Sequence, residues 1–159
     1  MAKTVFYSFH YQRDVHRVQL VRNIGALEGQ PLLGAQKWEE VKAKGNAAIE
    51  AWIDEQMKYK KAVIVLIGQE TASRPWVQYE IKRAWDLKRP LLGVHIYGLS
   101  SMGSVDRKGA DPFLKAGISG VPVFDPTVRN LNGNIDSQAT YKVLERDLEG
   151  WSNQGVVRS

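Results

Sequence analysis

The chain contains no cysteine among its 159 residues. Disulfide bonds, thiolate-ligated metal sites and a cysteine nucleophile are therefore all excluded. The longest uninterrupted apolar run, Ala62–Ile67, is far shorter than the roughly 18 residues that indicate a membrane span. The first residues also lack the apolar stretch of a secretory signal. We therefore expect a cytoplasmic protein that does not interact with membranes.

Charge of either sign is not concentrated along the chain. Lysine and arginine number 22 against 17 aspartate and glutamate, which gives a formal net charge of +5. The basic residues are scattered and do not alternate with aromatic residues as in nucleic-acid-binding surfaces, so no nucleic-acid partner is expected. Hydrophobic residues make up 43% and charged residues 25%, as in ordinary globular proteins. We predict a single domain over 1–159, with a core at about 4–150 and a frayed C-terminal tail at 151–159.

Four segments have the pattern of strands. Thr4–Phe9 is rich in β-branched and aromatic residues. Ala62–Ile67 and Leu91–Tyr97 are continuous hydrophobic runs, which is typical of strands buried on both faces of a parallel sheet. Val121–Phe124 contains a proline, which indicates a strand at the edge of the sheet.

Helical patterns alternate with these strands, at Val15–Asn23, Asn46–Tyr59, Pro75–Lys88 and a last helix through Leu144 and Leu148. Asp14 and Asn46 are expected to be the N-caps of the first two. The segment Ile24–Gly45 has little clear period, apart from a helical piece around Lys37–Lys44. Alternating strands and helices predict an α/β, three-layer flavodoxin-like fold with a central, mostly parallel sheet.

In such a fold the ligand crevice lies at the carboxyl ends of the strands. This selects the segments after Ser8, after Ile67 and after Ile96. None of them carries a GxGxxG or GxxxxGK[ST] phosphate loop, and the three histidines lack HExxH spacing. The remaining candidate is Glu80, which follows Trp76 by four residues and lies in the second turn of its helix, near the crevice. The alternative is a surface glutamate that benefits from the helix N-terminus.

The run Ser73–Glu80 resembles the S-x-x-W-x-x-x-E pattern of TIR domains. Further phrases resemble the TIR-like family of the Thoeris antiphage protein ThsB: Phe6–Tyr11, Val21–Asn23, Trp52–Gln56, Val65–Gly68 and Lys108–Phe113. The resemblance extends from about Thr4 to Phe124. The chain departs from the family at Val77, where many TIR domains have a cysteine.

The resemblance implies a TIR-like fold and an enzyme that cleaves NAD+ at the nicotinamide–ribose bond. Glu80 would be the catalytic residue, and the product would be a cyclic or modified ADP-ribose signal that activates a separate effector protein in bacterial antiphage defence. NAD+ is then a substrate, and neither a cofactor nor a metal is expected. Activity would depend on self-association or on a phage-derived trigger.

Five residues are candidates for substrate binding. Ser8 lies where a ribose or diphosphate would be met, and His10 either donates to a phosphate or is merely solvated. Phe9 and Tyr11 either stack on a base or belong to the core. Trp76 is expected to shape the pocket wall.

Two other functions remain open at this point. A non-catalytic TIR-like interaction module would act through TIR–TIR assembly, but it would not need a carboxylate at the crevice. A flavodoxin-like nucleotide-binding protein of unrelated role would need another phosphate loop, and the chain has none.

Overall fold

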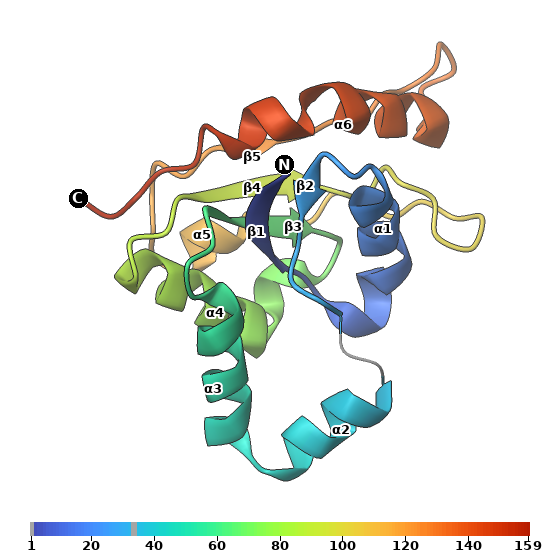
Figure 1. The fold of residues 1–159 in the computed structure, drawn as a ribbon. Coiled ribbons are helices and arrows are strands. Elements are labelled where there is room, and N and C mark those ends of the chain that lie inside the picture. Colours follow the sequence, from blue (N-terminus) through green and yellow to red (C-terminus); the bar gives the residue numbers. More distant parts are fainter. Residues whose placement is uncertain (1, 33–34) are drawn as a thin grey trace.

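The computed structural model describes residues 2–32 and 35–159, which form a five-stranded sheet covered by helices (Figure 1). The strand order is β2-β1-β3-β4-β5, and all neighbouring strands run parallel. The strands are β1 (Lys3–Ser8), β2 (Leu27–Glu28), β3 (Ala62–Ile67), β4 (Leu91–His95) and β5 (Val123–Phe124). The predicted α/β fold and its parallel central strands are therefore confirmed. The last strand lies at the edge as predicted, but it is shorter than Val121–Phe124 because it begins only after Pro122.

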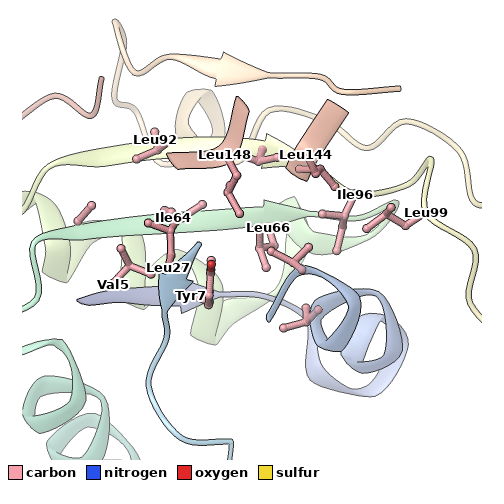
Figure 2. Close-up of a cluster of buried hydrophobic side chains, with 14 residues drawn as sticks. Val5, Tyr7, Leu27, Ile64, Leu66, Leu92, Ile96, Leu99, Leu144 and Leu148 are labelled. Atoms are coloured by element: carbon pink, nitrogen blue, oxygen red, sulfur yellow. The ribbon is translucent and has the colours of Figure 1, made fainter. Parts of the chain in front are cut away.

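The sheet separates two hydrophobic clusters, one on each face. β3 is buried at all six positions, and its side chains alternate between the two clusters. The cluster in Figure 2 joins Ile64 and Leu66 to Leu144 and Leu148 of α6 (Ser137–Ser152), and α1 (Tyr11–Asn23) packs on the same face. The other cluster packs α3 (Asn46–Met57) and α4 (Pro75–Asp86) against Val63, Val65 and Ile67. Burial on both faces explains why this strand is apolar throughout.

Both predicted N-caps are wrong, Asp14 by four residues and Asn46 by one. α1 begins at Tyr11, so Asp14 lies inside its first turn, where it is buried and pairs with Arg17 at 3.3 Å. α3 begins at Asn46, and Gly45 occupies its N-cap position with φ of 94°. A backbone in this region is readily adopted only by glycine, so the geometry of the turn decides where the helix starts.

The segment with little sequence period contains β2 and α2 (Ala35–Ala43). β2 has only two residues, which pair with Lys3 and Thr4. A strand this short leaves no alternating pattern in the sequence. α2 begins two residues before the predicted helical piece at Lys37. It lies beside α3 and projects from the body of the molecule (Figure 1).

The C-terminal tail differs from the frayed segment predicted at 151–159. α6 continues to Ser152, and Val156 then pairs with Leu91 at the start of β4 through two backbone hydrogen bonds of 2.8 and 3.0 Å. The long loop after β4 is also fixed, because the buried Arg17 donates to the carbonyl oxygens of Leu99 and Ser104. α5 (Pro112–Lys115) follows within the same loop. Within the described ranges, no helix has the length and apolar character to cross a membrane.

Candidate active site

A cavity of about 380 Å³ opens beside the carboxyl end of β1. Its walls come from the turn between β1 and α1, from the segment after β2, from α2 and α3, and from the first two turns of α4. These segments are far apart in the sequence, and the parallel sheet brings them together where a ligand crevice is expected. The predicted crevice is therefore present.

Glu80 lies in this cavity and is held by Ser8. The Ser8 hydroxyl donates to Oε1 of Glu80 over 2.7 Å, and Ser8 is fully buried as the last residue of β1. Only 9% of Glu80 is exposed. Because α4 starts at Pro75, Glu80 falls in its second turn, on the side facing β1. The alternative of a surface glutamate is thus wrong. The predicted position of Glu80, in the second turn of the helix and near the crevice, is right.

Burial changes the acidity of Glu80. Loss of solvation raises the pKa of Glu80 from 4.5 to about 8, and the hydrogen bond from Ser8 acts in the opposite direction by favouring the carboxylate. At neutral pH the carboxyl group of the free protein is therefore mostly protonated. A cation placed next to it would lower the pKa and convert it to the charged form.

The aromatic residues predicted for substrate binding form one side of the cavity. Phe9 and Tyr11 both line it, with ring centroids 6.1 Å apart, and Phe9 also packs against the core. Trp76 lines the wall near Glu80 and contacts Tyr79 edge to face at 5.6 Å. Phe9 therefore belongs to the core, whereas Tyr11 is exposed, and stacking of either ring on a base stays a prediction.

His10 also lines the cavity, close to the charges of Arg74, Glu70 and Arg13. Burial and the charge of Arg74 lower the pKa of His10, so the imidazole is neutral at pH 7. Its Nδ1 is buried without a hydrogen-bond partner among the described residues. Of the five residues predicted to bind substrate, only Ser8 does not line the cavity itself; it lies behind Glu80.

The sequence prediction missed two basic side chains at the cavity. Lys42 reaches it from α2, and Arg74 reaches it from the residue before α4. Nη2 of Arg74 donates a 2.7 Å hydrogen bond to Glu70, and Arg13 forms a 2.8 Å ion pair with the same carboxylate. Glu70 is therefore shared between two cations. Arg74 lies inside the S-x-x-W pattern and could have been found there, whereas no pattern identifies Lys42.

Apart from Glu80, no described residue that lines the cavity is acidic. The site therefore combines one buried neutral carboxyl group with basic and aromatic walls. This suits a ligand that carries both a cationic ring and an anionic group. Nowhere in 2–32 or 35–159 are three histidine, aspartate or glutamate side chains grouped so that they could hold a metal ion.

Comparison with known proteins identifies relatives of this chain. Residues 6–101 match the family model described as "Thoeris protein ThsB, TIR-like domain", an interval that includes Ser8 and Glu80. The protein named "Putative cyclic ADP-D-ribose synthase ThsB1" from Bacillus cereus (strain MSX-D12) is 35% identical over 119 residues. That match covers 71% of this chain and 62% of the relative. The chain thus spans somewhat less than two thirds of the relative's length.

Proposed function

Because the chain belongs to the TIR-like domain family of the Thoeris protein ThsB, we propose that it cleaves NAD+ at the nicotinamide–ribose bond. The product is a cyclic or modified ADP-ribose, and this nucleotide activates a separate effector in antiphage defence. The observation that carries the proposal is the buried Glu80, held by Ser8 at 2.7 Å in a cavity beside the end of β1.

Glu80 suits the charge that develops when this bond breaks. Nicotinamide leaves as a neutral base, so little acid catalysis is needed, while positive charge appears on the ribose ring. A carboxylate next to the ring stabilises that charge, most strongly where water is excluded. The cationic nicotinamide ring of bound NAD+ lowers the pKa of Glu80 from about 8, so substrate binding itself releases the proton and produces the catalytic carboxylate.

The remaining walls suit the rest of the substrate. Arg74 and Lys42 supply positive charge for the diphosphate, and Phe9 and Tyr11 supply rings for stacking on a base. A volume of about 380 Å³ lies within the range of roughly 300–1,000 Å³ found for small-molecule sites. The cavity accommodates the reacting half of NAD+, and its open mouth leaves room for the other half.

The apolar lining favours a cyclic product over simple hydrolysis. Ile49 and Ile53 of α3 and Val77 of α4 line the cavity and are almost fully buried. They offer no hydrogen bonds to a water molecule beside the reacting carbon. Attack by a group of the same nucleotide is then favoured, since it is held close and does not have to be recruited from solvent.

No resident cofactor is needed for this chemistry, because NAD+ is consumed as the substrate. The effector is reached through the diffusible product and needs no contact with this chain. Self-association or a phage-derived trigger would control the activity, as the family resemblance of the sequence implies.

Incubation of the purified protein with NAD+, followed by mass analysis of the products, tests the proposal. Reactions are run with and without extract from phage-infected cells, so that a missing trigger is supplied. We expect equal amounts of released nicotinamide and a cyclic or modified ADP-ribose, and neither from Glu80→Gln. If cells that express the protein are protected from phage but none of these reactions converts NAD+, the non-catalytic interaction module is favoured instead.

A further inference from the structure

Gln30 makes an unusual pair of hydrogen bonds next to the cavity. Its side-chain Oε1 accepts from the Tyr7 N–H, and its Nε2 donates to the Tyr7 carbonyl oxygen, both over 2.8 Å. Only 3% of Gln30 is exposed. One side-chain amide therefore satisfies both backbone groups of a single residue of β1, as a neighbouring strand would do.

This amide replaces a strand that ends too early. β2 pairs with β1 only as far as Thr4, opposite Glu28, so within the part of the chain that the structure describes no strand continues beside Tyr7 on that edge. The chain can turn away at Gly29 only because that residue lacks a Cβ, which would lie 2.6 Å from the Tyr7 ring and 2.7 Å from the Arg22 guanidinium. Arg22 then donates to the Gln30 carbonyl oxygen over 2.7 Å and fixes the start of the segment beyond it.

Gln30 is connected to Glu80 by a short chain of contacts. It holds both backbone groups of Tyr7, and the next residue, Ser8, donates to Glu80 over 2.7 Å. β3 pairs with the end of β1 on one edge, with Val65 opposite Ser8, and Gln30 holds Tyr7 on the other edge. Gln30 and the two residues that follow it, Pro31 and Leu32, line the same cavity.

We propose that Gln30 is a positioning residue for the reaction at Glu80, acting through the backbone of Tyr7 and the hydroxyl of Ser8. It does not touch the reacting atoms through this contact; it fixes the end of β1 so that Ser8 meets Glu80 at hydrogen-bonding distance. The effect of Gln30 on catalysis rests on the proposed function. The effect of Gln30 on the pKa of Glu80 can be measured without any turnover.

Gln30→Met keeps the length of the side chain and removes both hydrogen bonds, which makes it the variant of choice. Gln19→Met is the matched control, because Gln19 is exposed on α1 and, among the described residues, its side chain bonds only to Asn23. The first readout is the carboxyl titration of Glu80 by NMR in protein labelled with ¹³C-glutamate, with the resonance assigned by its absence from Glu80→Gln. The second is kcat and KM for NAD+ across pH.

In Gln30→Met we expect the titration midpoint of Glu80 to move to higher pH, because the bond from Ser8 that favours the carboxylate is weakened. We also expect kcat to fall about tenfold to a hundredfold, with a smaller change in KM. Gln19→Met should match the parent in both respects. A purely structural role would reduce the active fraction without moving the midpoint, and an unmoved midpoint in folded Gln30→Met would overturn the proposal.

The other titratable side chains that face the cavity come from three stretches of the chain, and none obscures this measurement. They are Tyr7, His10 and Tyr11 around the end of β1, Lys42 of α2 and Arg74 before α4. Burial lowers the pKa of His10, away from that of Glu80. The ¹³C label in any case reports on glutamate alone.

If Gln30→Met does not fold, Gln30→Leu provides the second test. Leucine also lacks both hydrogen-bonding groups, and it adds no charge near Glu80. We expect the Glu80 midpoint to shift in the same direction, and no shift would overturn the proposal. Failure of both variants to fold would assign Gln30 to stability alone and also overturn it. A parent protein that leaves NAD+ intact would defeat the proposed function, whereas the NMR titration would still decide the role of Gln30.

Discussion

Replacement of Glu80 by glutamine is expected to stabilise the protein while abolishing its activity. The change keeps the size of the side chain and its acceptor for the Ser8 hydroxyl. It removes a carboxyl group that loses solvation on folding, which raises its pKa from 4.5 to about 8. An acid whose pKa is raised in the folded state destabilises that state above its unfolded pKa, because the unfolded chain ionises more easily.

The size of this destabilisation follows from the two pKa values. Each pH unit between the two pKa values adds about 1.4 kcal/mol to the difference in unfolding free energy between the parent and Glu80→Gln. The parent should therefore be less stable than Glu80→Gln by about 1 kcal/mol at pH 5, about 3 kcal/mol at pH 7 and about 5 kcal/mol at pH 9. Below pH 4 the carboxyl group is protonated in both states, and the difference should vanish.

Urea unfolding of both proteins at pH 5, 7 and 9 measures this difference. Glu55→Gln is the matched control, since Glu55 is an exposed residue of α3. It should change the free energy of unfolding by no more than about 0.5 kcal/mol at any of these pH values. In parallel, nicotinamide release by Glu80→Gln should fall by roughly a hundredfold to a thousandfold. A stability difference that does not grow with pH would refute the assignment of Glu80 as a buried, neutral acid.

Three further predictions follow from the same geometry. The rate of NAD+ cleavage at limiting substrate should rise with pH up to about 8, and Ser8→Ala should move that rise to higher pH, because the bond that favours the carboxylate of Glu80 is lost; a pH–rate profile of kcat/KM measures both. Arg74→Gln should raise KM for NAD+ about tenfold, equal to about 1.4 kcal/mol of binding free energy, with little change in kcat, and an unchanged KM in steady-state kinetics would remove Arg74 from diphosphate binding. Gly29→Ala should lower the free energy of unfolding by about 1–3 kcal/mol, because its methyl group would press on Tyr7. Gly150→Ala in α6 is its control, since it meets nothing within 4 Å and should stabilise the helix in the same thermal unfolding assay.

The sequence predicted those parts of the fold whose burial leaves a local pattern. β3 and β4 are visible as apolar runs because helices cover both faces of the sheet. β2 is invisible because it has two residues, and its contribution to β1 is continued by the side chain of Gln30. Helix starts were misplaced where a turn geometry, as at Gly45, outweighs the preference of a neighbouring polar residue for the N-cap.

The candidate site was predictable to the same extent. Glu80 and Trp76 lie four residues apart on one helix, so helical spacing alone places both near the crevice. The burial of Glu80 could not be predicted, because it depends on walls contributed by distant segments such as α2 and α3. Gln30 was missed for the same reason, since it acts through hydrogen bonds to Tyr7, 23 residues away. Lys42 was missed because its place at the cavity depends on how α2 packs against the rest of the fold.

The pairing of Val156 with Leu91 has a practical consequence for immobilising or labelling the protein through its termini. Leu91 is the first residue of β4, and Lys3, the first of β1, donates to the Ser152 carbonyl oxygen over 2.9 Å. Both ends of the chain therefore leave the molecule near the amino ends of the strands, whereas the cavity opens at their carboxyl ends. A tether or fluorophore attached to either terminus would leave the mouth of the cavity facing the solution, so surface-based binding measurements with NAD+ analogues need no internal attachment point.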